Sequence, residues 1–514
     1  MMPCAALLVA ALLQGIGPEP TPDEILADHI RTRLEHAAVP RGDSAVLFEF
    51  YVRRAFRAVW SNEQGPNRLA DDLIAAINRA DLDGLDPQTY HTDELQAALR
   101  SVRDDAAAGR TTEPERAAAL DLLLSDAFLR YGSDLLSGHV DPETLRPQWQ
   151  ANPRAADLPA LLDEALASRK IARALQRLAP PQEGYRRLRD ALARMRAIIA
   201  NGGWPADLAA RLRLEGDLRD GDSLAVGIKH YQWRHGLDTT GALDVDTRAE
   251  LAVSPEERVE QLRLNLERWR WLPQDLGRRR IIVNIAAQEL QVIEDDQTVL
   301  SMRVIVGRRY KRTPIFSDTV RYIVLNPNWR VPRSIAVEDL LPKIQQDHSY
   351  LERFGMQVFD TTGPAPREID PDSVDWSAIS ADNFPYRLTQ EPGRLNALGR
   401  IKFVFPNRYD VYLHDTPAHE LFAQAQRDFS HGCIRVEYPL ELAAYLTRKS
   451  KWNGEMIERA LDQGTERTIY LPRPIPIHLL YWTAWADEDG TIQFRRDINN
   501  ADRPLASALL ANRD

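Results

Sequence analysis

Cysteine is scarce in this 514-residue chain, which has only Cys4 and Cys433. Cys4 lies in an apolar N-terminal run, so loss of that run would leave a single thiol. One thiol cannot form an internal disulfide, and this excludes a fold held together by disulfides. Long apolar runs are also absent, because no segment after residue 20 approaches 18 consecutive apolar residues. That absence excludes a membrane-spanning helix there.

The chain also lacks an excess of positive charge. Its 65 Lys and Arg residues face 75 Asp and Glu residues, giving a formal net charge of −10. A nucleic-acid partner would require a basic stripe, but the longest basic run is the triplet at 278–280. No nucleic-acid partner is expected. The length and the 44% hydrophobic content predict several globular domains.

Residues 1–20 resemble a signal peptide in length and in their apolar core. No Lys or Arg precedes the core, so an uncleaved anchor is the alternative. Cys4 comes too early in the run to be a lipoprotein acylation site. We therefore expect an exported, periplasmic protein.

Cys433 stands in the run Asp-Phe-Ser-His-Gly-Cys-Ile-Arg-Val at 428–436. A thiol attacks as its thiolate, and cations such as Arg435 or a protonated His431 would lower its pKa. Gly432 would let a substrate carbonyl approach the backbone closely. A buried structural cysteine is the alternative. These neighbours favour a nucleophile with an oxyanion site beside it.

His414 ends an alternating run at 408–414 that predicts a strand, and a turn-like Asp-Thr-Pro follows it. A short helix at 418–426 would fold the chain back and bring the imidazole to the sulfur. His414 is thus the candidate base for Cys433.

A zinc site is the competing interpretation of this region, because His414, Asp415, His419 and Glu420 are close in sequence. Pro417 interrupts any helix that would place both histidines on one face. We therefore predict no metal.

The histidine, the spacer and the Ser-His-Gly-Cys-hydrophobe-Arg run resemble the signature of the L,D-transpeptidases, which have the YkuD-type fold. The likeness extends upstream through 281–285, 302–308, 313–317 and 325–332, and it is closest to the large YcbB-type subfamily. The resemblance implies that Cys433 attacks the amide before the terminal D-Ala of a peptidoglycan tetrapeptide stem. The acyl group would then pass to an amine of a second stem, forming a 3→3 crosslink.

The resemblance also implies the roles of other residues. Ser430, His431 and Gly432 would shape the oxyanion site, and Arg435 would act electrostatically. It implies no cofactor, a carbapenem adduct at Cys433, and peptidoglycan stems, glycan and cell-wall synthesis proteins as partners. Four candidates for the substrate wall, with core packing as the alternative, are Tyr322, Asn326, Trp329 and Arg400.

The predicted fold class is multidomain α+β. Its parts are a helical scaffold domain (21–182), a three-helix peptidoglycan-binding-like domain (183–253), a linker helix (254–278), a β-rich catalytic domain (279–472) and a C-terminal appendage (473–514). A capping insertion of helix and loop (about 335–399) interrupts the catalytic domain, and we expect its mobility to gate substrate entry. The Gln232-Trp233 pair is expected to pack in a core rather than to bind sugar.

Two classes of function stay open. One is an enzyme that uses the acyl-enzyme for transpeptidation, for L,D-carboxypeptidase hydrolysis or for attaching a protein amine. The other is a non-catalytic wall-binding protein. The motif cannot separate the acceptors.

Overall fold

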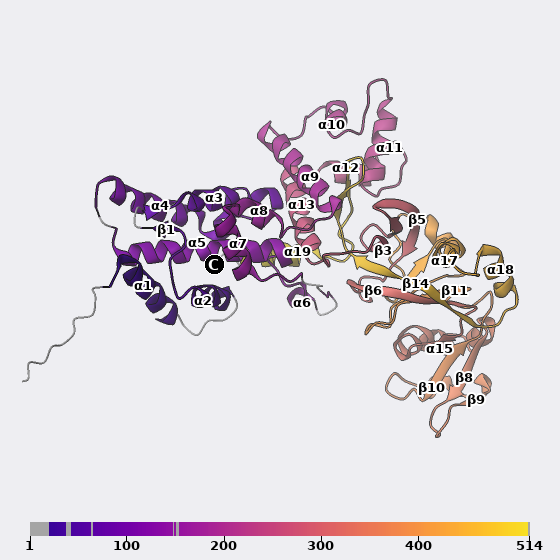
Figure 1. The fold of residues 1–514 in the computed structure, drawn as a ribbon. Helices are drawn as coiled ribbons and strands as arrows, with labels where there is room; N and C mark the ends of the chain where they lie inside the picture. The colour runs from indigo at the N-terminus through magenta and orange to yellow at the C-terminus, as the bar shows by residue number, and fades with distance from the viewer. Residues whose placement is uncertain are drawn as a thin grey trace, which may run out of the picture. The chain divides into compact units, whose positions relative to one another are not determined.

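The computed structural model describes residues 20–36, 43–62, 65–110, 112–146, 149–150 and 154–511. The predicted signal peptide lies outside the described residues, except for its last residue. The chain divides into two compact units, one formed by residues 1–136 and 155–179 and the other by residues 137–154 and 180–514. Figure 1 shows a helical first unit and a second unit that contains the strands of the barrel.

The first unit is helical because apolar residues recur at helical spacing and side chains cap several helix starts. Asn67, for example, accepts a hydrogen bond from the Leu69 amide at the start of α3. The helices are α1 (Pro22–His36), α2 (Asp43–Arg53), α3 (Arg68–Ile77), α4 (Thr92–Ala107), α5 (Pro114–Ser137), α7 (Leu158–Ser168) and α8 (Ile171–Gln176), with a short hairpin of β1 (Ser61–Asn62) and β2 (Gly65–Pro66).

One buried carboxylate joins this hairpin region to α5. Asp121 accepts a hydrogen bond from the Tyr51 hydroxyl at 2.7 Å and from the amides of Val59 and Trp60 at 3.0 and 2.8 Å. Burial raises the pKa of Asp121 to about 6, although these hydrogen bonds oppose the rise.

The compact helical unit runs to residue 179 but lacks residues 137–154, which fall inside the predicted scaffold domain of 21–182. Residues 137–154 are grouped with the second unit, where Val140 has hydrogen-bond partners. The Val140 amide donates to Glu267 at 2.8 Å, and the Val140 carbonyl accepts from the Trp271 indole at 3.0 Å. Trp149 forms an isolated bridge with Ile315.

The predicted three-helix domain also begins later than residue 183. Helix α9 (Glu183–Ala200) packs along α13 (Pro255–Arg270), so the predicted linker helix is largely buried. The small bundle consists of α10 (Leu208–Leu214), α11 (Leu224–Arg234) and α12 (Val245–Leu251).

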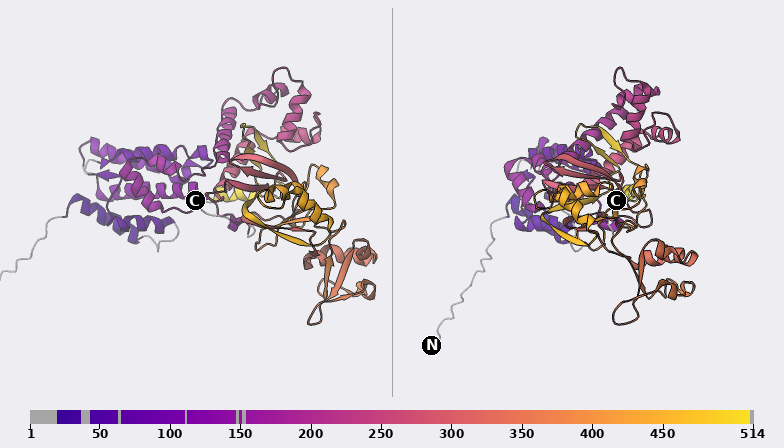
Figure 2. Two further views of the ribbon diagram at one scale, coloured as in Figure 1. Left: turned by 45° about the vertical axis from the view of Figure 1, so that its right-hand side comes forward. Right: turned by 90° about the vertical axis from the view of Figure 1, so that its right-hand side faces the viewer.

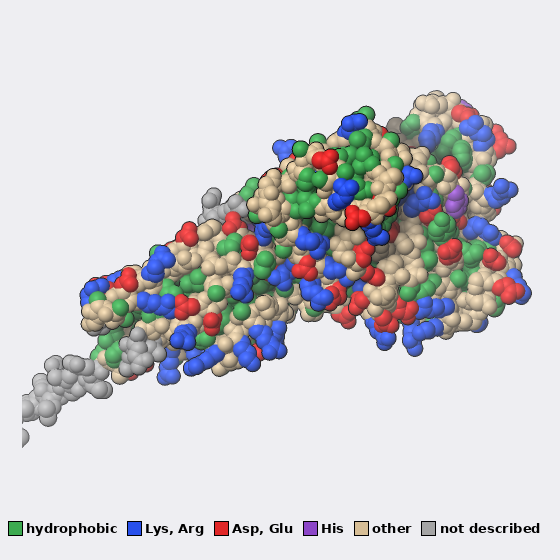
Figure 3. Space-filling model, turned by 90° about the horizontal axis from the view of Figure 1, so that it is seen from above, with side chains coloured by type: hydrophobic (Ala, Val, Ile, Leu, Met, Phe, Trp, Pro, Cys, Tyr) green, Lys and Arg blue, Asp and Glu red, His purple; other side chains and the backbone are tan. Residues whose placement is uncertain are grey.

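Of the Gln232-Trp233 pair of α11, the first residue is buried and the second is exposed. Gln232 is buried and its amide nitrogen donates to the Ala242 carbonyl and to Thr247, each at 2.9 Å. Trp233 is 48% exposed, so core packing was the wrong expectation for it. Other exposed apolar residues of this bundle are Leu214, Leu224, Val226 and Val245. Figure 3 shows apolar side chains gathered there, and acids and bases interspersed elsewhere on the face in view.

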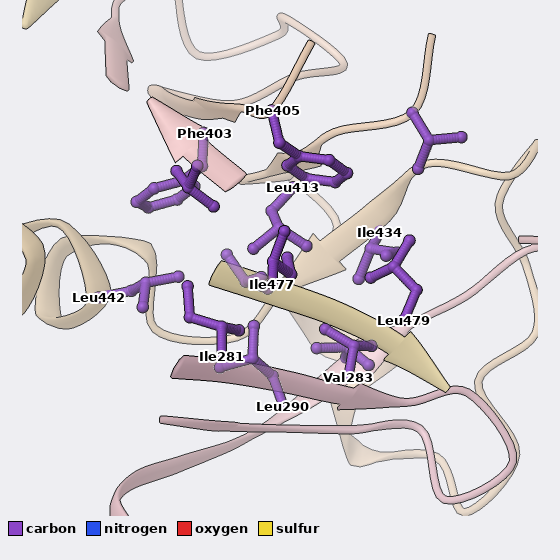
Figure 4. Packing of buried hydrophobic residues seen from close by; sticks show 14 of the residues in the cluster. Ile281, Val283, Leu290, Phe403, Phe405, Leu413, Ile434, Leu442, Ile477 and Leu479 are labelled. Carbon is purple, nitrogen blue, oxygen red and sulfur yellow. The ribbon is translucent and has the colours of Figure 1, made fainter. Parts of the chain in front are cut away.

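A closed eight-stranded barrel forms the core of the second unit, with the strand order β11-β12-β13-β5-β4-β3-β14-β6. Alternate residues fill its interior, among them Val283, Phe403, Leu413, Ile434 and Ile477 (Figure 4). The strands are β3 (Arg279–Asn284), β4 (Glu289–Glu294), β5 (Gln297–Ile305), β6 (Phe316–Leu325), β11 (Ile401–Val404), β12 (Leu413–His414), β13 (Ile434–Val436) and β14 (Arg467–Leu480), and the helices α17 (Pro439–Thr447) and α18 (Gly454–Asp462) follow β13.

The last barrel strand crosses the boundary predicted at residue 472. After an irregularity between Tyr470 and Ile475, β14 continues and pairs with β3 as well as β6. Prolines at 472, 474 and 476 obscured this strand, since proline usually marks a strand edge or a bulge. The barrel therefore needs residues that were assigned to the appendage.

The remaining C-terminal elements are a hairpin and a helix. β15 (Ala484–Ala486) and β16 (Ile492–Phe494) flank the predicted polar turn at 487–490, and α19 (Asp502–Ala511) follows. Within the described residues, no helix combines the length and the apolar character that a membrane span requires.

The insertion is a folded subdomain rather than a long loop. It has a four-stranded sheet and its own apolar core, which includes Trp329, Ile344, Val358 and Trp376. Figure 2 shows it as a compact orange group. Its elements are β7 (Trp329–Arg330), α14 (Arg333–Ile335), the π-helix η3 (Ala336–Leu340), α15 (Leu341–Gln346), α16 (Tyr350–Arg353), β8 (Met356–Asp360), β9 (Arg367–Ile369), η4 (Pro371–Ser373), η5 (Trp376–Ala378) and β10 (Tyr386–Gln390).

Candidate active site

Strand pairing places Cys433 and His414 on one face of the barrel wall. β12 and β13 run parallel, with Leu413 opposite Ile434 and His414 opposite Arg435. Figure 4 shows Leu413 and Ile434 in the interior cluster. Side chains alternate along a strand, so His414, Arg435 and Cys433 point outward. The candidate nucleophile, base and arginine thus share a surface.

The connection to His414 differs from the prediction. Only the last two residues of the run 408–414 form a strand. Asp410 has a left-handed backbone with φ of 53°, and the Asn407 amide donates to the carbonyls of Phe405 and Val411, so the preceding residues form a turn. The predicted helix at 418–426 is a short 3-10 helix, η6 (His419–Ala423).

His414 is buried and held in one tautomer. Its Nδ1 lies 2.5 Å from the Asp415 carbonyl, which can only accept, so Nδ1 carries the proton and Nε2 is left as an acceptor. Burial, together with the positive charge of Arg435, lowers the pKa of His414 to about 3. The ring is therefore neutral near pH 7, the state that a general base requires.

The Asp415 carboxylate fixes the backbone that holds His414. Its Oδ2 accepts from the Arg400 amide at 2.8 Å and its Oδ1 from the Thr416 amide at 2.7 Å. Gly399 has φ of +61°, and a Cβ there would lie 2.4 Å from the Asp415 carboxylate. Glycine is thus required at 399 both by its backbone and by the space.

The Cys433 thiol is half-buried and donates to the Asp410 carbonyl at 3.8 Å. Burial raises the pKa of the Cys433 thiol, whereas Tyr412 and the positive charge of Lys402 oppose the rise. Lys402 faces His414 across β11 and β12, and its Nζ lies 3.7 Å from the centre of the Tyr412 ring. Neither Lys402 nor Tyr412 was predicted, because only strand register brings them to the thiol.

Ser430 and Gly432 brace the loop before Cys433. The Ser430 hydroxyl donates to the Cys433 carbonyl at 2.5 Å and accepts from the Gly432 amide at 3.1 Å. Gly432 has φ of +115°, and its carbonyl accepts from Thr313 Oγ1 at 2.9 Å. Only glycine adopts this backbone without strain. In this conformation the Gly432 amide donates to Ser430 within the loop, so it is not free to bind an oxyanion.

His431 belongs to an ionic network that links the barrel to the insertion. Its ring contacts Asp339 of η3 and the guanidinium of Arg308. Arg308 also lies 3.1 Å from Asp339, and Lys311 pairs with Glu338 at 2.7 Å. Burial lowers the pKa of His431, although Asp339 opposes this. A protonated His431 is therefore disfavoured near pH 7, and the cations that interact electrostatically with the thiol are Lys402 and Arg435.

Three of the four substrate-wall candidates have structural roles. Asn326 is buried and donates to the carbonyls of Ala460 and Leu461 at 3.2 and 3.1 Å. Trp329 packs in the insertion core, and Arg400 forms a surface ion pair with Asp462. The fourth, Tyr322, occupies an outward position on β6, on the same side of the wall as Cys433.

The thiol and the neutral imidazole on one barrel face form a candidate site for nucleophilic acyl transfer. Residues 278–465 match the family profile of the YkuD L,D-transpeptidase catalytic domain, and residues 45–192 match the Scaffold domain profile. The chain thus contains an L,D-transpeptidase catalytic domain of the YkuD family and a Scaffold domain, and both were expected from the family resemblance.

A protein of Haemophilus influenzae named "Putative L,D-transpeptidase" is 35% identical over 256 residues, which are 50% of this chain and 51% of that protein. The match thus spans about half of the relative. Two solved structures are also similar. An L,D-transpeptidase from Mycobacterium smegmatis is 13% identical, with a TM-score of 0.18 over 39% of this chain and 58% of that chain. The Ldtfm-avibactam carbamoyl enzyme is 11% identical, with a TM-score of 0.18 over 57% and 98%.

Proposed function

We propose that the protein is an L,D-transpeptidase that forms 3→3 crosslinks in peptidoglycan through a thioester on Cys433. The observation that carries the proposal is the outward-facing pair of Cys433 and a neutral His414 on adjacent strands of a YkuD domain. The substrate is a tetrapeptide stem that ends in D-Ala.

In the first half-reaction, Cys433 Sγ attacks the carbonyl carbon of the third stem residue. Nε2 of His414 accepts the thiol proton, since its Nδ1 is already committed to Asp415. A C–S bond forms and the C–N bond to D-Ala breaks. The imidazolium returns the proton to the departing amine, which releases D-Ala and restores the neutral ring.

In the second half-reaction, a side-chain amine of another stem attacks the thioester. A C–N bond forms, the C–S bond breaks, and the proton of the amine returns to the thiol through His414. The buried, cationic Arg435 opposes retention of a proton on His414, because it lowers the pKa of the ring. This favours proton release to the leaving group.

The proposal includes a periplasmic location, with residues 1–20 as the export signal, and the proposed peptidoglycan substrate supports it. The same nucleophile would open the ring of a carbapenem and retain it as an adduct. Cell-wall synthesis proteins are proposed as partners because crosslinking depends on a supply of uncrosslinked stems.

The test is to incubate the purified protein with disaccharide-tetrapeptide and to analyse the products by tandem mass spectrometry. The expected product is a dimer that has lost one D-Ala and contains a 3→3 linkage, and it should be absent with Cys433→Ala and His414→Ala. Tripeptide without dimer would indicate a carboxypeptidase instead. Binding to insoluble peptidoglycan with no product from the wild type would contradict the proposal and indicate a wall-binding protein.

A further inference from the structure

A row of outward-facing side chains runs from Cys433 across the barrel wall. The pairing of Leu413 with Ile434 places Tyr412 beside Cys433, and the Tyr412 side chain interacts with the thiol. The pairing of Phe403 with Leu413 places Val404 beside Tyr412. Tyr322 pairs with Val404, and Tyr470 pairs with Tyr322. The row is therefore Cys433, Tyr412, Val404, Tyr322 and Tyr470. The last three lie on the consecutive strands β11, β6 and β14, and Cys433 and Tyr412 directly precede β13 and β12.

The far end of this row is an exposed aromatic pair. Tyr470 is 75% exposed, and Tyr322 is half-buried. Their ring centres are 5.4 Å apart with the planes inclined at 50°. Tyr470 thus contributes little to the barrel core, whose residues on this strand include Ile469 and Leu471. Exposed aromatic rings aligned with a nucleophile suggest a ligand-binding surface.

The opposite side of Cys433 is basic. The segment 308–312 carries Arg308, Arg309, Lys311 and Arg312. Asp339 and Glu338 of the insertion form ion pairs with Arg308 and Lys311. This segment adjoins the nucleophile loop, because a Cβ on Gly432 would lie 3.5 Å from the Arg312 carbonyl. The surface around Cys433 therefore has a cationic end and an aromatic end.

We propose that Tyr322 and Tyr470 bind the sugar that carries the donor stem, an inference that rests on the proposed function. Neighbouring strands are about 4.8 Å apart, so these tyrosines lie about 14 and 19 Å from Cys433 along the row. Three stem residues separate the attacked carbonyl from the sugar, and at about 3.5 Å each they span roughly 10 Å before the linker to the sugar is added. A stem that follows the row thus delivers its sugar to the tyrosines.

The charges fix the direction of this stem. The carboxylate of the leaving D-Ala points to the basic segment 308–312, and the amino end of the stem points along the row. A pyranose ring has faces of C–H groups that can lie against the Tyr470 and Tyr322 rings, while its hydroxyls stay in water. The polar tip and apolar body of tyrosine suit such a wet, half-apolar contact.

The experiment compares kcat/KM for D-Ala release from two donors, disaccharide-tetrapeptide and the same tetrapeptide without sugar. The wild type should prefer the sugar-bearing donor. Tyr470→Leu should reduce this preference about tenfold while leaving the sugar-free rate unchanged, and Tyr470→Phe should retain most of it because the ring remains. Thr468→Ala is the matched control, since Thr468 is exposed two residues earlier on the same strand.

An unchanged preference in Tyr470→Leu, or an equal loss with both donors, would overturn the proposal. A loss that depends only on a sugar on the acceptor stem would overturn the donor assignment. Failure of the wild type to release D-Ala from either donor would instead refute the proposed function, and the sugar site with it. These results differ from one another, so each failure identifies its own cause.

Discussion

Lys402 should determine how readily the Cys433 thiol ionises. Its positive charge opposes the rise in the thiol pKa that burial causes, and it reaches the site by lying across the Tyr412 ring. Burial lowers the pKa of Lys402 itself, but the pKa of a lysine starts near 10, so the group stays largely charged at neutral pH. Replacing it by methionine keeps most of the apolar stem and removes the charge.

The magnitude follows from the geometry. Lys402 Nζ is 3.7 Å from the Tyr412 ring centre. Adjacent side chains across strands are about 5 Å apart, which puts the charge about 7 Å from the sulfur. At an effective dielectric constant of about 20, that separation gives about 2 kcal/mol, and solvent at this half-exposed site reduces it to about 1.4 kcal/mol. Lys402→Met should thus raise the thiol pKa by about one unit.

The assay is the rate of Cys433 alkylation by iodoacetamide between pH 5 and 9, with peptide mapping to separate Cys433 from Cys4. Because the pKa of His414 is about 3, the ring stays neutral across this range and the profile reports the thiol. Below the thiol pKa, Lys402→Met should react about tenfold more slowly. The exposed Lys449→Met is the control. Coincident profiles for wild type and Lys402→Met would refute the electrostatic role.

Three further changes test other parts of the structure. Gly399→Ala should displace the Asp415 carboxylate and lower kcat for D-Ala release more than tenfold with little change in KM, and an unaltered kcat would contradict this positioning role. Asp339→Asn should loosen the contact with His431, seen as faster amide exchange in 336–340 and 428–433; protection equal to wild type would argue against an ionic link. Asp121 has a raised pKa of about 6 when folded and about 3.9 when unfolded, so its contribution is greatest below pH 4 and lost as pH rises through 6. Helical-unit stability, followed by exchange of α5 amides, should therefore fall by about 2 kcal/mol between pH 4 and 6 in the wild type and less in Asp121→Asn.

The parts of the site that the sequence predicted are those encoded locally. The Ser-His-Gly-Cys-Ile-Arg run marks a thiol, the predicted strand end and the turn after it mark His414, and the family resemblance adds the YkuD domain. Lys402 could not be found in this way, because it lies 31 positions before Cys433, from 433 − 402, and reaches the site through the pairing of β11 with β12. The hydrophobic pattern of one strand does not show which residues of a distant strand pair with it.

The fold was predictable where periodicity was regular, as in the helical unit and the strands at 281–325. It was less predictable in the insertion, since strands as short as β9 leave almost no alternation to detect. The prolines of β14 similarly resembled a domain end, although they lie at the irregularity and in the paired strand beyond it. Trp233 shows that helical spacing alone does not identify which face is buried.

The central claim is that a stem peptide becomes bonded to Cys433. Intact-mass spectrometry of the protein rapidly quenched in acid after mixing with disaccharide-tetrapeptide tests this most directly. The account predicts an added mass equal to the donor minus D-Ala, mapped to Cys433, absent in Cys433→Ala and lost on treatment with hydroxylamine. Crosslinked product formed at the wild-type rate by Cys433→Ala, or an adduct mapped to another residue, would contradict it.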